Sequence, residues 1–328
     1  MENKVLVSLS LYFNEEQVKG KGEDSAMRIT GTPNAALIAT MDGCGGAGAQ
    51  VYAKANNVSG ARIAAEHVGI ALRKWFQEKQ YGFFGTGGKA ADQLASEMKD
   101  AINCELKRQL ELVGGEESGV KSRLARTFPS TLAAVLAEII ETNVIRCVSF
   151  WVGDSRTYVF RASGLQQTSR DDIRGHGDPF DALMNDGRLS NLVSISADYE
   201  IHSAESVLTE PGIILTASDG CFSYFRSPME FEWALLDTLV QSSNPKEWED
   251  KLRNLFGSYA SDDFTMNIAI LGFCNWSAVQ NAYTPRWSEF NEKYCKPMKH
   301  ILSAEDQQAH YELWLQYKKE YLFEDGSH

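Results

Sequence analysis

Five acidic residues occupy positions where a metal ion could be bound. Asp42, Asp154 and Asp219 stand next to glycines or in tight turns, in the fragments MDG, GDSR and SDG, each just past an apolar run. Asp262 comes just before another apolar run, and Asp24 lies in KGEDSA, between the first two expected strands. A hard divalent cation is held by several carboxylate oxygens, and a glycine lets the backbone approach and offer its carbonyl. Oxygen ligands alone favour Mg²⁺ or Mn²⁺ over zinc.

Each of these Asp-Gly or Gly-Asp pairs, taken alone, is explained more simply as a turn, because both residues favour tight turns. The same region also offers a second interpretation. Gly43, Gly45 and Gly48 satisfy the spacing G-x-G-x-x-G of dinucleotide-binding loops. That loop must open directly into a helix within a βαβ unit, whereas the clear helical pattern begins only at Ser59. The later strands resemble hairpins, so the dinucleotide interpretation is disfavoured.

The elements that would position these acids can be followed along the chain. Alternating apolar residues over 5–11 and a short apolar run over 35–41 predict strands. Helical patterns follow over 60–75, 89–112, 229–240 and 247–259, and the run VIRCVSFWVGDSRTYVFRASG predicts a hairpin. The stretch 128–140 is rich in Ala and Leu, and periodicity does not decide between helix and buried strand. SAED at 303–306 predicts a helix cap before a long aromatic helix.

Composition restricts the class of protein. The 328 residues are 43% hydrophobic and carry a formal charge of -12, which disfavours a nucleic-acid or anionic-membrane surface. No apolar run approaches the roughly twenty residues that span a bilayer, and the first residues do not resemble a secretion signal. The six cysteines are scattered and form no C-x-x-C pair, which indicates reduced thiols. We therefore expect a cytoplasmic protein without a nucleic-acid or membrane partner.

The ordered fragments GEDSA, MDGCGG, VGDSRTYVFR, TASDG and SDDFTMNIAIL together resemble the metal-dependent serine/threonine protein phosphatases, the type 2C or PPM family, and its bacterial members in particular. The resemblance spans roughly residues 5–273. It implies an α+β fold, a four-layer α-β-β-α sandwich of two mostly antiparallel sheets flanked by helices. It also implies that 128–140 is largely a strand. We expect a catalytic domain at 1–275 and a C-terminal helical extension at 276–328.

The resemblance further implies a binuclear centre with two Mn²⁺ or Mg²⁺ ions, and an additional weaker ion in many members. By this resemblance, Asp42 bridges the two ions, Gly43 lends its main-chain carbonyl, and Asp219 and Asp262 are the other direct ligands. Glu23 and Asp24 would hold metal-bound waters, and Asp154 would form the additional site with Asp219. The implied reaction is hydrolysis of phosphoserine or phosphothreonine in proteins by a metal-activated bridging water or hydroxide, as in signalling.

The sequence departs from the family pattern in two places. Cys44 stands where many members carry a histidine, and the arginine that often precedes the Glu-Asp pair has no clear match. Lys19, Lys21 or Arg28 could replace it, although a lysine lacks the bidentate fork of arginine. These departures keep an alternative open, a catalytically weak phosphatase-like module that binds or regulates a partner.

Two further segments carry hypotheses about substrates and partners. Residues 178–191 fall where the family has a mobile flap, and there Arg188 with its acidic neighbours could set substrate choice, or the segment could be a plain surface loop. The aromatic helix near the C-terminus, which bears Tyr311, Trp314, Leu315 and Tyr321, could pack on the main domain and cover a sheet edge, bind a partner, or pair subunits.

Overall fold

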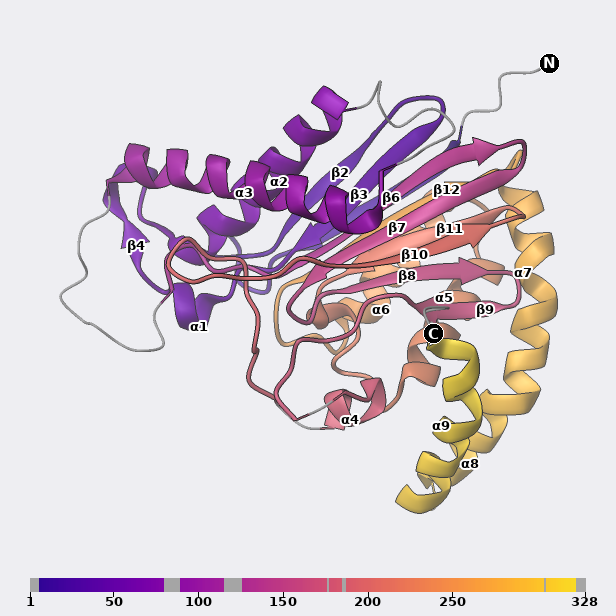
Figure 1. The fold of residues 1–328 in the computed structure, drawn as a ribbon. Coiled ribbons are helices and arrows are strands. Elements are labelled where there is room, and N and C mark those ends of the chain that lie inside the picture. The colour runs from indigo at the N-terminus through magenta and orange to yellow at the C-terminus, as the bar shows by residue number, and fades with distance from the viewer. Residues whose placement is uncertain are drawn as a thin grey trace.

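Two five-stranded antiparallel sheets form the centre of the molecule in this computed structural model, which describes residues 6–79, 89–114, 126–175, 177–184, 187–303 and 305–322 (Figure 1). The first sheet has the strand order β1 (Val7–Glu15), β12 (Phe264–Leu271), β11 (Gly212–Ala217), β8 (Arg156–Arg161) and β9 (Gly164–Gln167). The second sheet has the order β10 (His202–Leu208), β7 (Val144–Val152), β6 (Leu132–Glu141), β3 (Ala35–Met41) and β2 (Ser25–Gly31).

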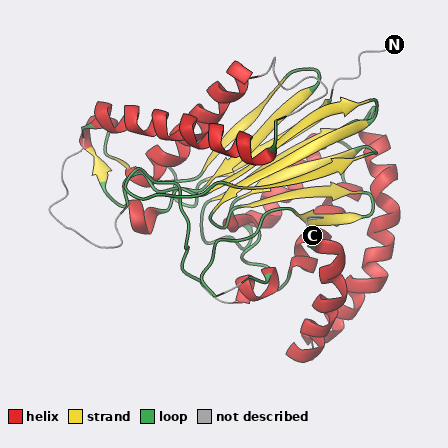
Figure 2. Cartoon of the chain, viewed as in Figure 1, coloured by secondary structure: helices red, strands yellow, loops and turns green. Residues whose placement is uncertain are grey.

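Helices cover the outer face of each sheet, which produces the predicted four layers (Figure 2). The helices α2 (Gly60–Lys79) and α3 (Ala91–Val113) pack on the second sheet, and α5 (Pro228–Val240) and α6 (Pro245–Gly257) pack on the first. In a four-layer sandwich each sheet packs against helices on one face and against the other sheet on the opposite face, so both faces of a central strand such as β3 are apolar. Its Leu37 faces the helices, its neighbour Ile38 faces the other sheet, and every residue of the strand is buried. The four-layer α+β sandwich is confirmed.

Several further elements before the C-terminal helices are short. They include α1 (Gly45–Gly48), the small hairpin β4 (Val51–Tyr52) and β5 (Val58–Ser59), and α4 (Pro179–Met184). None of the helices in the described ranges is both long and apolar enough to cross a bilayer.

The undecided stretch 128–140 contains a strand. Strand β6 pairs with β3 on one side and β7 on the other, and its residues from Leu132 to Glu138 are buried. An Ala- and Leu-rich sequence favours a helix only weakly, by tenths of a kcal/mol per residue. Burial on both faces of a central strand is worth more, so tertiary packing decides the conformation.

Of the two helix caps expected from the sequence, the structure contains one. The Ser59 hydroxyl accepts a hydrogen bond from the Arg62 backbone N–H (3.2 Å) at the start of α2. The cap expected at Ser303 is wrong, because Ser303 is the last residue of α8 (Lys296–Ser303). The following helix α9 (Gln307–Tyr321) begins after Asp306, whose carboxylate accepts from the Ala309 backbone N–H (2.9 Å).

The C-terminal helices share the apolar core of the first sheet. Helix α7 (Trp276–Phe290), a π-helical turn (Asn291–Cys295), α8 and α9 lie along the side of the sandwich near β8 and β9 (Figure 1). The Tyr283 hydroxyl donates to the Phe160 carbonyl (2.5 Å), and the rings of Tyr158 and Tyr321 lie 6.3 Å apart. Of the roles considered for this segment, packing on the main domain is the one visible here.

A buried ion pair joins α7 to α5. The Arg286 Nε donates to Glu232 Oε1 (2.8 Å), and both side chains are at least 97% buried, with exposures of 3% and 0%. The Tyr317 hydroxyl of α9 donates to the other Glu232 oxygen. Burial raises the pKa of Glu232, and the charge of Arg286 opposes that rise. The carboxylate therefore depends on partners from the C-terminal helices.

We predict that Arg286→Met lowers the free energy of unfolding by about 3–5 kcal/mol, because it leaves the Glu232 carboxylate buried without its counter-ion. Urea unfolding monitored by tryptophan fluorescence measures the change. Lys246→Met is the matched control, since the exposed Lys246 side chain pairs with Glu249 (2.7 Å) at the surface and its loss should cost under about 1 kcal/mol. Equal losses in the two variants would show that the buried pair is not needed.

Candidate active site

The acidic residues meet at one edge of the sandwich because the strands are antiparallel. Ser25 pairs with Met41, so Asp24, just before β2, and Asp42, just after β3, leave the second sheet at the same edge. Ala217 of β11 pairs with both Arg156 of β8 and Met266 of β12. The turns that carry Asp154, Asp219 and Asp262 therefore emerge together from the first sheet.

Hydrogen bonds between the sheets hold the two groups of acids in register. The hydroxyls of Thr40 and Thr216, both fully buried, lie 2.8 Å apart, two residues before Asp42 and three before Asp219. The Asn267 amide donates to the Ala39 carbonyl (2.7 Å). Such polar contacts inside an otherwise apolar interface fix one register, because any slip would leave buried polar atoms unpaired.

The backbone of Asp42 is anchored separately. Its carbonyl accepts from the Thr131 backbone N–H (2.8 Å) and the Ser130 hydroxyl (3.0 Å), and its N–H donates to the Thr131 hydroxyl oxygen (3.1 Å). The same Thr131 hydroxyl lies 2.6 Å from that of Ser155, which follows Asp154. The Asp42 and Asp154 turns are thus linked through one threonine.

The loop that carries Glu23 and Asp24 is held by Asp263. The two carboxylate oxygens of Asp263 accept from the backbone N–H groups of Gln17 and Glu23, each at 2.8 Å. The Ser218 hydroxyl donates to the Asp24 carboxylate (2.7 Å), and the Ser59 hydroxyl donates to the Glu23 carboxylate. In the pair Asp262-Asp263, the second acid therefore positions the loop, while the first is exposed and lines the cavity described next.

A cavity of about 740 Å³ contains all the acidic residues expected at the site. Those that line it are Glu23, Asp24, Asp42, Asp154, Asp219 and Asp262, together with Gly43 and Cys44. The structure thus brings together every residue proposed as a metal ligand or as a holder of metal-bound water. Two positive charges that sequence reasoning did not select, Arg126 and Arg174, line it as well, as does Arg188.

The candidate phosphate-binding residues from the sequence do not reach this cavity. Arg28 stacks on the Tyr12 ring, with its guanidinium carbon 4.2 Å from the ring centroid, and donates to the Tyr12 hydroxyl. Lys19 and Lys21 are exposed in the loop after β1 and are not among the lining residues. The positive charge at the cavity comes instead from arginines of other segments.

Crowding of carboxylates raises their pKa values. Burial, then the charges of Asp24 and Asp219, raise the pKa of Asp42 well above its ordinary value. Burial raises the pKa of Asp24 to about 7 and, with the charge of Asp262, that of Asp219 to about 6. Burial and Asp219 likewise raise the pKa of Asp154 well above its usual range. Such pKa shifts are typical of like charges that lie close together in a site partly shielded from solvent.

Close backbone approaches explain the glycines at this edge. A Cβ on Gly43 would lie 2.6 Å from the Ala61 carbonyl oxygen, and one on Gly45 would lie 2.0 Å from a Glu23 carboxylate oxygen. A Cβ on Gly220, directly after Asp219, would lie 2.0 Å from the Asp263 carbonyl oxygen. The need for glycine at these positions is therefore explained by packing between the acid-bearing turns, without a dinucleotide.

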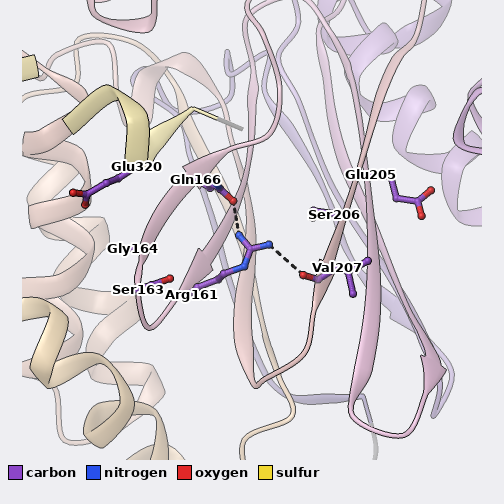
Figure 3. A pocket seen from close by; sticks show the side chains of 8 residues that line it. All are labelled: Arg161, Ser163, Gly164, Gln166, Glu205, Ser206, Val207 and Glu320. Carbon is purple, nitrogen blue, oxygen red and sulfur yellow. Dashed lines mark hydrogen bonds between the residues drawn. The ribbon is translucent and has the colours of Figure 1, made fainter. Parts of the chain in front are cut away.

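A second hollow, of about 620 Å³, lies beside the β8–β9 hairpin, β10 and α9 (Figure 3). Its charged groups already have partners. Arg161 donates to Gln166 and to the Val207 carbonyl (3.3 Å), and Glu205 pairs with Arg146 (2.5 Å). Its charged side chains are thus already engaged within the protein, so the acidic cavity is the stronger candidate for chemistry.

Comparison with known proteins places the chain in a family. The sequence profile of a family described as "Protein phosphatase 2C" matches residues 16–257, well over half of the chain. The chain therefore belongs to the protein phosphatase 2C family, and it is a protein serine/threonine phosphatase by class. Among curated proteins, none matches its sequence.

Solved structures share the fold at low sequence identity. The serine/threonine phosphatase Stp1 from Staphylococcus aureus is 19% identical, with a TM-score of 0.55 over 83% of this chain and 98% of that chain. The phosphatase PstP/Ppp of Mycobacterium tuberculosis is 18% identical, with a TM-score of 0.54 over 82% and 100%. The catalytic domain of PstP in complex with two manganese ions is 18% identical, with a TM-score of 0.53 over 81% and 100%.

We predict that Gly220→Ala lowers the free energy of unfolding by about 1–3 kcal/mol and reduces phosphatase activity, because the new methyl group would force the Asp219 and Asp263 turns apart. Thermal unfolding and turnover of 4-nitrophenyl phosphate measure the two effects. Gly177→Ala is the control, since a Cβ there meets nothing within 4 Å and Gly177 does not line the cavity. A Gly220→Ala protein that matches Gly177→Ala in both assays would contradict this account.

Proposed function

We propose that this phosphatase hydrolyses phosphoserine and phosphothreonine with two divalent cations, Mn²⁺ or Mg²⁺, held at the acidic cavity. Asp42 would bridge the ions, with the Gly43 carbonyl, Asp219 and Asp262 as further ligands. The supporting observation is that acids from both sheets, far apart in the sequence, line one cavity and raise one another's pKa. The manganese-bound structure of PstP supports the choice of metal.

The donor chemistry of the cavity fits such ions, because its lining offers carboxylate oxygens and the Gly43 backbone. The side chains as they lie do not yet form a site, since within the described ranges no group of three or more His, Cys, Asp or Glu is arranged to hold a metal. Burial and the charges of neighbouring carboxylates raise the pKa values of Asp42 and Asp219, as expected for like charges that compete for protons. A cation would replace those protons once the side chains turn toward a common centre, and would remove the repulsion.

Bound ions would supply an activated water as nucleophile and positive charge for the phosphoryl oxygens. The side chains of the protein would position the reacting groups. Glu23 and Asp24 would orient water through oxygens fixed by Ser59 and Ser218. By the family resemblance, Asp154 with Asp219 would hold an additional, weaker ion.

Cys44 is poorly suited to proton transfer. Burial and the charge of Asp42 raise the pKa of its thiol well above the ordinary value, so the thiol stays neutral near pH 7. For contacting the phosphate, Arg126 is a better candidate than Lys19, Lys21 or Arg28, because it lines the cavity. It is half-buried, and its backbone N–H donates to the Ala47 carbonyl (3.0 Å) in the glycine turn after Asp42.

The protein substrate would be met in the cytoplasm, where the six unpaired cysteines would stay reduced.

We predict that Asp42→Asn and Asp219→Asn each reduce manganese-dependent turnover of a phosphopeptide by about 10³-fold or more, because metal stabilisation of the transition state is worth several kcal/mol. Asp154→Asn should reduce turnover less than these two variants, and mainly at low metal concentration. Asp100→Asn, on the exposed face of α3, is the matched control and should remain active. Retention of wild-type activity in Asp42→Asn or Asp219→Asn would refute the assignment.

Metal binding is tested without turnover. Mn²⁺ at about one hundred times its dissociation constant should stabilise the wild type against unfolding by about 2.7 kcal/mol. Asp42→Asn should lose most of this gain, while Asp100→Asn keeps it. An active wild type with no metal-dependent stabilisation would refute the binuclear site, whereas stabilisation without turnover would support the alternative, a phosphatase-like binding or regulatory module.

A further inference from the structure

The cavity that holds the acids also carries positive charge where it opens to solvent. Arg174 and Arg188 both line the cavity and are both exposed, so they lie near its mouth. The segments that bear them run side by side. The Arg174 backbone N–H donates to the Arg188 carbonyl (3.1 Å), and Ile173 and Leu189 form an antiparallel bridge. The two arginines are therefore presented as a pair by a short piece of two-stranded structure.

These segments are tied to the sandwich by Asp172. Its backbone carbonyl accepts from the Ser190 N–H (2.8 Å) and hydroxyl (2.9 Å). Its carboxylate accepts from the Gly153 N–H (2.9 Å) and the Asn191 amide (2.8 Å). Since Gly153 directly precedes Asp154, the paired segments and the acid-bearing turn share one anchor.

The side chains of this pair have no partner in the described part of the chain. Neither the Arg174 nor the Arg188 guanidinium has a hydrogen bond, ion pair or ring contact among the described residues. Arg156, by contrast, also lies near the acids but is buried and held by Asp171, with Nη2 and Oδ2 2.6 Å apart. Each guanidinium of the pair can therefore form a bidentate contact with an incoming carboxylate.

We propose that Arg174 and Arg188 bind acidic side chains beside the phosphorylated residue, so that the enzyme selects phosphopeptides with Asp or Glu next to the phosphoserine or phosphothreonine. This inference rests on the proposed function, which assigns the phosphoryl group to the acidic end of the cavity. A fully extended peptide advances by at most about 3.6 Å per residue. An acidic residue within two positions of the phosphate is therefore within reach of the cavity mouth.

The overall charge of the protein explains why this pair of arginines would matter for the choice of peptide. The chain carries a formal charge of -12, so its surface in general repels an acidic peptide. At the mouth of the cavity, the guanidiniums of Arg174 and Arg188 supply positive charge, and the ions of the proposed function would offset the charge of the lining carboxylates. Asp198, another lining residue, does not cancel the guanidiniums, because its carboxylate is paired with Lys99 (2.8 Å). A peptide with neutral flanks would leave both arginines without a partner.

The test compares two phosphopeptides of identical sequence, except that Asp or Glu on both sides of the phosphoserine is replaced by Asn or Gln. For the wild type, kcat/KM should favour the acidic peptide by roughly 2- to 30-fold at low ionic strength, the effect of two exposed ion pairs. The preference should shrink at high salt. In the double variant Arg174→Gln/Arg188→Gln it should fall to about one. Arg73→Gln, on the exposed face of α2 and outside the cavity, should keep the wild-type preference.

Turnover of 4-nitrophenyl phosphate separates this proposal from the proposed function. If the wild type hydrolyses it but shows no preference between the peptides, or if the double variant keeps the full preference, the arginine pair does not select acidic flanks. If no phosphate ester is turned over, the proposed function fails, and fluorescence anisotropy of the two labelled peptides then tests the pair directly. Tighter binding of the acidic peptide that is lost in the double variant would support the pair, and equal binding would overturn it.

Discussion

The structure depends on the polar contacts that lock the two sheets in register at one edge. The Thr40–Thr216 hydrogen bond and the Asn267 amide lie inside an apolar interface, directly behind the turns that carry Asp42 and Asp219. Apolar side chains alone tolerate small shifts between packed sheets, whereas buried polar groups leave unpaired atoms when they shift. Residues more than 170 positions apart are thereby fixed against one another, as the Thr40–Thr216 separation of 176 shows.

This register forces like charges together, which opposes folding. Burial and mutual repulsion raise the pKa values of Asp24, Asp42, Asp154 and Asp219, so the cluster favours protons or cations. The large aromatic core on the opposite side of the first sheet, to which the C-terminal helices contribute, provides stabilisation that offsets such strain. The crowded carboxylates lower the stability of the folded protein when no cation is bound, while the core away from them is well packed. This combination is expected where function and stability conflict.

Much of this arrangement could be predicted from the sequence, for identifiable reasons. Acids at the ends of apolar runs and helices with clear periodicity are local signals, and family resemblance gave their order a meaning. Strand β6 had to be inferred from that resemblance, because its local composition favours a helix and only two-sided burial decides otherwise. The loop-holding role of Asp263 and the presence of Arg126 at the cavity could not be predicted. Both depend on contacts across more than 70 residues that leave no periodic pattern, such as the 240 positions between Asp263 and Glu23.

Diffraction from crystals soaked in Mn²⁺, collected at a wavelength where manganese scatters anomalously, tests the central claim most directly. This account predicts two strong anomalous peaks in the cavity that share the Asp42 carboxylate, one of them also next to Asp219. Crystals that bind manganese only elsewhere on the surface, or that show no peak between Asp42 and Asp219, would contradict it.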